Sequence, residues 1–468
     1  MPASSIVLAM VASHLTPFGA IAVMALAVAV VLSPSDSSRG QSPPAGRGLI
    51  AAFGYRRRRM PEGSKFAGFF GALEYRRAKG GLELGRIGTI PIKLFERDSV
   101  IVFGPTQSYK TSRLVIPAIT AFGGAVIATS VKDDIVRATA AARGMTFAWV
   151  FDPYGISRYA NCYWNPIGPA IAPDLARRLA GTICAPRNVE HATEESTFWY
   201  ALAARMAEPL LVAASLLAGD LRMVMDWVET RDFTQPAAAL ADGDCQRLRM
   251  ALLASLDREE RQLSSVITTL EKCLEPFLHG TSVVAGWRNA ADFKAEDGET
   301  LYLVAPPNRQ GEVGPVFSAL MRIHLDRVFA QPPKSGLLMV LDEAANIAPI
   351  ANLDEVVSVI AAYNVQMMTI FQDFSQVRAR YGDRASTVVN NHRAKLFLGA
   401  ISDPETIYLA ETLCGSAMPS DARRSHSTGP VSEALLPRGG LRSLRPGDGL
   451  LIYGHRDPAL LRLRSAPR

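Results

Sequence analysis

The 468-residue chain has little cysteine, and none of its five cysteines belongs to a Cys-x-x-Cys pair. Scattered single cysteines indicate neither a disulfide framework nor a zinc site. Because disulfides persist mainly in oxidising compartments, this pattern favours a reducing one. The cysteines are Cys162, Cys184, Cys245, Cys273 and Cys414.

No charged residue occurs between Ile6 and Leu32, and the run from Leu15 to Leu32 is almost entirely apolar. That length is close to the ~20 residues that a membrane-spanning helix needs. We therefore predict a transmembrane anchor over residues 1–33. A cleaved signal peptide and an unrelated apolar extension are the alternatives. A signal peptide normally starts with basic residues, however, and none precedes Ile6.

Acidic residues are scarce in two further segments. Residues 34–60 carry six Arg and one Asp, and residues 34–81 are predicted to form a basic juxtamembrane linker. The positive-inside rule places this linker in the cytoplasm, which predicts a single-pass protein of the inner, cytoplasmic membrane with most of the chain in the cytoplasm. Residues 422–468 carry nine Arg and three acids, whereas residues 61–421 have a net charge of −5. The basic C-terminal segment is either a surface for nucleic acid or a solubilising tail.

Short apolar runs rich in β-branched residues alternate with helical patterns, which predicts an α/β fold with a mostly parallel sheet. Between Asp174 and His279 the pattern is helical throughout, with one helix or a pair over Thr197–Leu217 and a long amphipathic stretch over Cys245–Leu278. We predict a nucleotide-binding core over residues 82–170 and 296–468, interrupted by an all-α insertion over residues 171–295. The predicted strands lie at Thr89–Phe95, Val100–Phe103, Ala125–Ala128, Phe147–Phe151, Leu301–Ala305, Leu337–Leu341, Met367–Phe371, Leu396–Leu398 and Leu450–Tyr453.

One glycine is missing from a sequence that otherwise matches a phosphate-binding loop. The segment from Gly104 to Thr111 lies between a predicted strand and a predicted helix, and it departs from G-x-x-x-x-G-K-[ST] at Tyr109. In such a loop, backbone N–H groups and the helix N-terminus together hold an anion. We predict that Lys110 contacts the β- and γ-phosphates of ATP and that the Thr111 hydroxyl binds Mg²⁺. The other predicted nucleotide contacts are Gly104, Pro105, Thr106, Gln107, Ser108, Tyr109 and Ser112.

Tyr109 stands where glycine would accept backbone angles that a tyrosine resists, at a cost of about 1–2 kcal/mol. The loop could shift its backbone, or the ring could stack on a base or pack beside the site. We hypothesise that the loop binds nucleotide, but less tightly or more slowly than a glycine version would.

Two further segments supply the remaining candidate residues. The apolar run Leu337–Leu341 ends in Asp342 and Glu343, the form of a Walker B strand, in which Asp342 would hold Mg²⁺ and Glu343 would orient the attacking water. Gln372 ends the next predicted strand and could contact the γ-phosphate, although a simple strand-terminating turn explains it equally well. The predicted catalytic residues are Glu343, Gln372 and Lys110.

These segments together resemble the type IV secretion coupling proteins, the conjugative TraG/TraD family of membrane-anchored DNA-transfer ATPases. The resemblance extends from about Gly85 to Arg464, and Thr106-Gln107 and Tyr453–Arg456 are similar to an actinobacterial branch. Further matching segments are Leu114–Pro117, Val131–Asp133, Phe151–Pro153, Trp164–Pro166, Phe198-Trp199, Tyr363, Asp373, Ser375-Gln376, Asn391, Gly399, Asp403–Thr406, Leu444–Gly447 and Leu450–Tyr453.

The resemblance implies a RecA-like P-loop NTPase core with an inserted all-α domain, ATP and Mg²⁺ as cofactors, and a homo-hexameric ring. It also implies a role in feeding single-stranded DNA with an attached relaxase-type cargo protein into a type IV secretion channel. An FtsK- or HerA-like DNA pump outside conjugation is an alternative function. A weakly hydrolysing membrane platform that docks secretion substrates is another, since Tyr109 could reduce turnover.

The sequence also departs from the family pattern in two places. Many members have two transmembrane helices, whereas this N-terminus has room for one. Some members carry an arginine finger where this chain has Ala361, and Arg378, Arg380 or Arg393 of a neighbouring subunit could substitute.

Overall fold

The computed structural model describes residue 66 and residues 81–167, 172–185, 193–243, 245–281, 286–296, 298–347, 350, 352–417, 433–437 and 439–464. The chain divides into two units, Met1–Arg58 and Arg59–Arg468, and every described residue lies in the second. The predicted anchor over residues 1–33 and nearly all of the predicted linker over residues 34–81 lie outside the described residues. Within the described ranges, no helix combines the length and apolar character that crossing a bilayer requires.

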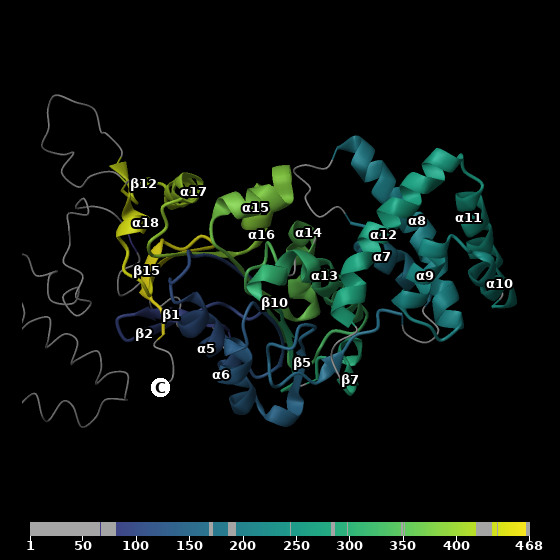
Figure 1. Ribbon diagram of the computed structural model, residues 1–468. Coiled ribbons are helices and arrows are strands. Elements are labelled where there is room, and N and C mark those ends of the chain that lie inside the picture. Colours follow the sequence, from purple (N-terminus) through teal and green to yellow (C-terminus); the bar gives the residue numbers. More distant parts are fainter. Residues whose placement is uncertain are drawn as a thin grey trace, which may run out of the picture. The chain divides into compact units, whose positions relative to one another are not determined.

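Thirteen strands of the described chain form one sheet, in the order β2-β1-β15-β14-β11-β3-β10-β9-β4-β8-β5-β6-β7 (Figure 1). From β11 to β7 every pairing is parallel, and from β11 to β2 every pairing is antiparallel. The predicted α/β class with a mostly parallel sheet is therefore confirmed. The parallel strands are β3 (Val100–Phe103), β4 (Ala125–Ser130), β5 (Ala148–Phe151), β6 (Cys162–Tyr163), β7 (Arg288–Asn289), β8 (Thr300–Val304), β9 (Leu337–Leu341), β10 (Val365–Phe371) and β11 (Ala394–Leu398).

The central strands are apolar on both faces because helices cover them. All residues of β3, β4, β8, β9 and β10 are buried. Continuous burial explains why these strands appear in the sequence as unbroken apolar runs rather than as alternating patterns. The predicted strands Val100–Phe103 and Leu337–Leu341 match β3 and β9 residue for residue.

The antiparallel end of the sheet joins the two ends of the described chain. β1 (Glu83–Ile87) and β2 (Ile90–Lys93) form a hairpin, and β1 pairs with β15 (Ala459–Arg462). In Figure 1 the purple N-terminal strands accordingly lie beside the yellow C-terminal ones. β14 (Asp448–Tyr453) connects this end to β11, and a separate two-stranded sheet pairs β12 (Ser416–Ala417) with β13 (Glu433–Ala434).

The helices of the α/β part connect successive strands. A π-helical turn, η2 (Thr111–Val115), continues into α5 (Ile116–Ala121), so the predicted helix Thr111–Ala121 exists but starts with a wider turn. The other helices are α6 (Asp134–Arg143), α13 (Gln310–Ala330), α14 (Leu353–Val359), α15 (Phe374–Tyr381), α16 (Ala385–Asn391), α17 (Pro404–Cys414) and α18 (Gly440–Ser443). Short 3₁₀ turns η3 (Met145–Phe147), η4 (Ala290–Asp292), η5 (Pro307–Arg309), η6 (Ile360–Tyr363) and η7 (Gly382–Arg384) complete the connections.

Among the described residues between β6 and β7, six consecutive helices follow one another and pack together. They are α7 (Pro173–Ile183), α8 (Glu194–Leu216), α9 (Leu221–Thr230), α10 (Thr234–Asp242), α11 (Gln246–Leu256) and α12 (Glu260–Thr281). The sequence predicted either one helix or a pair of helices over Thr197–Leu217. The structure has one helix there, α8, which contains Pro209. The single stretch predicted over Cys245–Leu278 is wrong in detail, because it divides into α11 and α12 after Leu256.

Candidate functional site

The loop between β3 and η2 has the backbone of a phosphate-binding loop. A Cβ on its first glycine, Gly104, would lie 2.8 Å from Leu398 Cδ1 and 2.9 Å from Ser108 Oγ, so both side chains would have to shift. Thr106 and Gln107 are exposed at the loop tip, while Ser108 and Lys110 are buried. Pro105, Thr111 and Ser112 are partly buried. The predicted nucleotide contacts thus form one continuous turn between strand and helix.

Tyr109 keeps the backbone conformation of the missing glycine. Its φ is 63°, and Gln107 in the same loop has a φ of 64°. A left-handed conformation costs a non-glycine residue roughly 1–2 kcal/mol, so the loop holds strain at two positions. The sequence left open that the loop shifts its backbone so that Tyr109 avoids the left-handed region. The structure does not show such a shift.

The Tyr109 ring packs beside the loop under an arginine. The Arg113 guanidinium lies 4.4 Å from the ring centroid, and the Tyr109 side chain remains 46% exposed. Arg113 in turn lies against Gly447, where a Cβ would come within 2.5 Å of Arg113 Nη1. Exposed cation–π pairs contribute about 0.5–1 kcal/mol, which offsets part of the strain at Tyr109.

Lys110 and Glu343 form a nearly buried ion pair. Lys110 Nζ lies 3.0 Å from Glu343 Oε1, and the two side chains are 11% and 12% exposed. Lys110 Nζ also donates to the Gly104 carbonyl at 3.4 Å. The second carboxylate oxygen of Glu343 accepts from Gln372 Nε2 at 3.3 Å. The fold therefore brings all three predicted catalytic residues into one hydrogen-bonded chain.

Asp342 lies deeper than Glu343 and is only partly satisfied. Its Oδ2 accepts from the Thr111 hydroxyl at 3.2 Å, and its backbone carbonyl accepts from the Thr129 hydroxyl at 2.9 Å. Within the described part of the chain, Asp342 Oδ1 and the nearby Ser108 Oγ have no hydrogen-bond partner. Burial raises the pKa of Asp342 to about 6, against the opposing effect of the Lys110 charge. A buried carboxylate oxygen with no partner is a candidate ligand for a cation.

Glu343 also has a strained backbone. Its φ is 57°, in the left-handed region, and it begins a tight turn. The amides of Asn346 and Ile347 both donate to the Glu343 carbonyl, at 3.0 and 3.1 Å. The next amide, that of Ala344, donates to Ile370 of the neighbouring strand at 3.1 Å. Such strain often marks positions where function sets the conformation.

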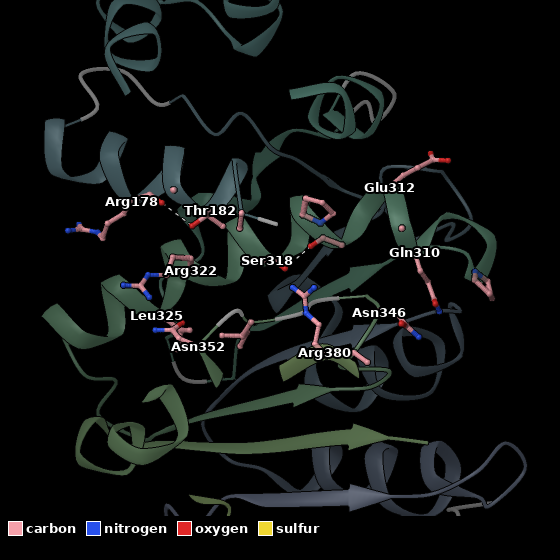
Figure 2. A pocket seen from close by; sticks show the side chains of 18 of the residues that line it. Arg178, Thr182, Gln310, Glu312, Ser318, Arg322, Leu325, Asn346, Asn352 and Arg380 are labelled. Carbon is pink, nitrogen blue, oxygen red and sulfur yellow. Dashed lines mark hydrogen bonds between the residues drawn. The ribbon is translucent and has the colours of Figure 1, made fainter. Parts of the chain in front are cut away.

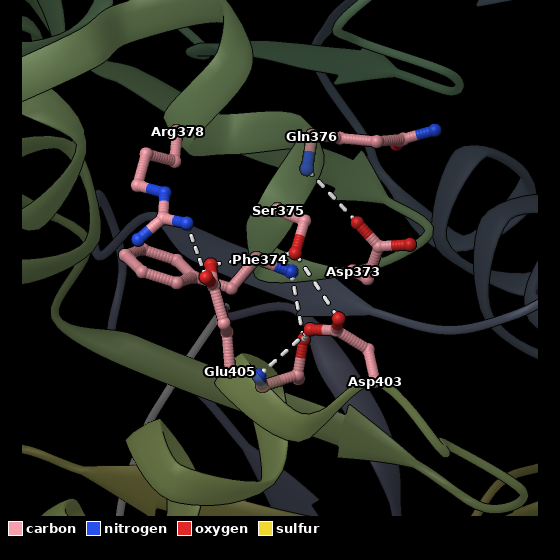
Figure 3. A network of polar contacts seen from close by, with 8 residues as sticks. Asp373, Phe374, Ser375, Gln376, Arg378, Asp403 and Glu405 are labelled. Carbon is pink, nitrogen blue, oxygen red and sulfur yellow. Dashed lines mark hydrogen bonds and ion pairs between the residues drawn. The ribbon is translucent and has the colours of Figure 1, made fainter.

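The backbone of Gln372 joins a network that sequence reasoning did not identify, and Figure 3 shows the part of this network that follows Gln372. The backbone amide of Gln372 donates to Gln376 Oε1 at 3.0 Å. Asp373 caps α15, because its side chain accepts from the backbone amide of Gln376 at 2.9 Å. The Ser375 hydroxyl donates to Asp403 Oδ1 at 3.1 Å, which connects α15 to the start of α17. Asp373 and Asp403 each precede a helix as N-caps, which is a signal readable from sequence.

The same network includes an ion pair at its exposed side. Arg378 pairs with Glu405, and the Phe374 amide donates to the Thr406 hydroxyl at 2.8 Å. Arg378 is thus engaged within its own chain. Arg393 lies elsewhere, with its Nε 3.6 Å from Asp98 Oδ2.

The donor set at this edge fits a nucleotide with Mg²⁺. Magnesium binds through one or two carboxylates completed by phosphate oxygens and water. The residues for this are Asp342 and Thr111, which already lie in hydrogen-bond contact. In the described ranges, no group of three or more His, Cys, Asp or Glu side chains could hold a metal alone. Asp342 and Thr111 therefore suit a Mg²⁺ whose remaining ligands are phosphate oxygens and water.

Two family models match the chain. The one described as type IV secretory system conjugative DNA transfer matches residues 73–172, and the one described as the TraM recognition site of TraD and TraG matches residues 336–443. The first match contains the phosphate-binding loop and the second contains Asp342, Glu343 and Gln372. The predicted resemblance to the type IV coupling proteins is confirmed.

Curated relatives agree with the family models. The conjugal transfer protein TraG of Escherichia coli is 24% identical over 344 residues, which cover 63% of this chain and 52% of that protein. Protein VirD4 of Agrobacterium fabrum (strain C58 / ATCC 33970) is 22% identical over 335 residues, covering 68% of this chain and 50% of that protein. The chain therefore spans about half the length of the curated relatives that it matches.

A solved structure shows the same fold. The plasmid coupling protein TrwB in complex with ADP and Mg²⁺ superposes with a TM-score of 0.69 at 16% identity, covering 86% of this chain and 93% of that one. The mixed α/β fold of the chain is therefore that of TrwB.

Proposed function

We propose that the chain is a membrane-anchored ATPase that couples ATP binding and hydrolysis to the delivery of single-stranded DNA into a type IV secretion channel. The observation that carries the proposal is the convergence of Lys110, Thr111, Asp342, Glu343 and Gln372 at the carboxyl edge of three adjacent parallel strands. In open parallel sheets, ligands bind outside this edge. The relationship to the coupling proteins supports DNA transfer as the purpose of the hydrolysis.

We infer the role of each residue from the hydrogen bonds and ion pairs that it makes in the structure. Lys110 releases Glu343 and turns to the β- and γ-phosphates, since phosphates offer it more negative charge than one carboxylate. Thr111 and Asp342 hold the Mg²⁺, which supplies neutralisation of phosphate charge. Glu343, freed from Lys110, accepts a hydrogen bond from the attacking water, and Gln372 donates to the γ-phosphate. TrwB has been seen with ADP and Mg²⁺, which supports this pair of ligands for the present chain.

We propose that the protein acts at the cytoplasmic membrane as a homo-hexameric ring in which a neighbouring subunit completes each site. Its partners are then single-stranded DNA, a relaxase-type cargo protein and components of the secretion channel.

ATP turnover by the full chain, measured with and without single-stranded DNA, tests the proposal. We expect turnover that DNA stimulates, and we expect Glu343→Gln to lower it at least ~100-fold because no group then polarises the water. The variant should still bind an ATP analogue. Turnover of the natural chain equal to that of Glu343→Gln would instead indicate a docking platform with no motor activity.

A further inference from the structure

A large cavity adjoins the carboxyl edge of the sheet on the side of α7 and α13 (Figure 2). Its volume is about 930 Å³, and its walls come from α7, from α13 between Gln310 and Leu325, from the turn after Glu343 and from Arg380 of α15. This is at the upper end of the roughly 300–1,000 Å³ typical of ligand sites. The cavity therefore has room for a stretch of polymer rather than a single ion.

Small residues on two helices keep the cavity open. Gly181 of α7 and Gly311 of α13 both line it, and a Cβ added at either position would meet no atom within 4 Å. Gly181 is the third residue from the end of α7, and Gly311 is the second residue of α13.

The charged groups of the cavity leave a positive excess. Arg178 and Arg322 share one carboxylate, that of Asp326, at 2.7 and 3.1 Å. The lining carboxylate of Glu312 is paired with Arg309 outside the lining, at 2.7 Å.

Arg380 adds a further charge at a buried position. Its guanidinium points toward α13 and Ser318 in Figure 2. Burial lowers the pKa of Arg380, because the charged form is poorly solvated there. A phosphate that approached this position would favour the charged form of Arg380.

A short turn of the chain links the cavity to Glu343 at the catalytic edge. Asn346 lines it, and the Asn346 amide donates to the carbonyl of Glu343 at 3.0 Å. Glu343 itself has the strained left-handed backbone, with a φ of 57°. A ligand that moves the turn at Asn346 therefore changes the position of the Glu343 carboxylate.

We propose that this cavity binds the backbone phosphates of single-stranded DNA and that its occupancy repositions Glu343 for hydrolysis. The inference rests on the proposed function, since it assigns the place where the DNA substrate is sensed. Guanidinium and amide groups are the usual partners of phosphates.

The lining favours the DNA backbone over two other occupants. None of the described residues that line the cavity is aromatic, so unpaired bases would find no stacking surface there. Binding is therefore expected to be independent of base sequence. An acidic peptide could also meet the arginines, but the proposed function requires DNA, not peptide, to trigger turnover at Glu343.

Gly311→Glu tests the proposal without removing any existing contact, because the position faces open space. We expect it to weaken binding of a fluorescent oligo-dT to the full chain roughly tenfold at about 100 mM salt, and to lower the salt slope by about 0.7 for one lost phosphate contact. The DNA concentration that gives half-maximal stimulation of ATP turnover should rise by a similar factor.

Two matched variants isolate the effect of a charge in the cavity. Gly311→Gln adds the same bulk without the charge. Gly123→Glu adds the same charge at an exposed site beyond the opposite edge of the sheet, where a Cβ also meets nothing within 4 Å. Both should bind oligo-dT as the natural chain does, and thermal midpoints confirm that all three variants fold.

Each contrary result has a distinct meaning. Unchanged binding in Gly311→Glu, equal weakening in Gly311→Gln, or equal weakening in Gly123→Glu overturns the assignment. Loss of poly-glutamate binding with unchanged oligo-dT binding also overturns it and identifies a peptide site. If the natural chain binds no DNA, the proposed function fails as well, and its ATP turnover then shows which part of that function survives.

Discussion

The two edges of the central sheet differ in how completely their polar groups are bonded. At the amino edge, before β3, the Asp98 carboxylate accepts from the Tyr453 hydroxyl and lies 3.6 Å from Arg393 Nε. The Asp98 carbonyl accepts from Gln366 Nε2 at 2.7 Å, and the Tyr453 hydroxyl accepts from the Phe95 amide at 2.8 Å. Each of these groups connects separate strands.

At the carboxyl edge of the same strands, bonding is incomplete. Asp342 Oδ1 and Ser108 Oγ have no partner among the described residues. Gln107, Tyr109 and Glu343 have positive φ values there, and Arg97 and Asn364 have them at the amino edge, so the unpartnered groups carry the contrast. Both edges belong to one sheet with one core, so the difference does not come from overall packing. It shows that the carboxyl edge is organised for a ligand, whereas the amino edge is organised for stability.

The largest difference between the edges should appear when a lysine is removed from each. Lys110→Ala deletes the cation that faces the phosphates, and we expect ATP turnover to fall roughly a thousandfold, as for the loss of a group that stabilises transition-state charge. Lys395→Ala removes a partly buried lysine at the start of β11, on the amino edge. Turnover should then change less than about twofold. Equal losses in the two variants would mean that the edges are not functionally distinct.

Next in size is the effect of neutralising Asp342. Burial raises its pKa to about 6, above the unfolded value of about 3.9, so the native state gains from protonation. The associated stability is present below about pH 4 and is lost as pH rises through about 6. We expect Asp342→Asn to raise the free energy of unfolding of the nucleotide-free chain by on the order of 3 kcal/mol at pH 8. Urea unfolding at pH 5 should show a smaller gain, and a gain independent of pH would contradict this account.

The same substitution at the amino edge should have the opposite sign. Asp98→Asn removes the charge that Arg393 approaches and weakens the bond from the Tyr453 hydroxyl. Hydrogen bonds to charged groups contribute about 1.5–3 kcal/mol, so we expect a loss of about 2 kcal/mol in the free energy of unfolding. ATP turnover below the melting transition should be unchanged. If Asp98→Asn raised the free energy of unfolding, or left it unchanged but abolished ATP turnover, the two edges would not differ in the way described.

The sequence predicted the elements and the ligand-binding edge better than it predicted the contacts. Buried parallel strands are continuous apolar runs, so β3 and β9 could be located without a structure. Residues that end parallel strands meet at one edge, so Lys110, Asp342 and Gln372 could be grouped in advance. The division of α11 from α12 near Asp257 had no glycine or proline to signal it, and it was missed.

Contacts between distant segments were beyond sequence reasoning. The Lys110–Glu343 pair joins residues 233 positions apart, and the Ser375–Asp403 bond joins α15 to α17. Both depend on strand order and helix docking, which no local pattern specifies. The stacking of Arg113 over Tyr109 differs in this respect, because it joins residues only four positions apart whose backbones are hydrogen-bonded at 2.9 Å.

The smallest expected effect tests whether the strain at the carboxyl edge is itself functional. Tyr109→Gly relieves about 1–2 kcal/mol of left-handed strain and removes the Arg113 stacking of about 0.5–1 kcal/mol. The two terms oppose each other, so stability should change by less than about 1 kcal/mol. Nucleotide affinity or turnover should nevertheless rise severalfold, because the loop no longer resists the phosphate-binding conformation. Arg113→Gln removes the stacking alone and should lower stability slightly without raising turnover. Unchanged affinity and turnover in Tyr109→Gly would show that the strain at this edge has no effect on the nucleotide, and that the unpaired groups around Asp342 alone distinguish it from the amino edge.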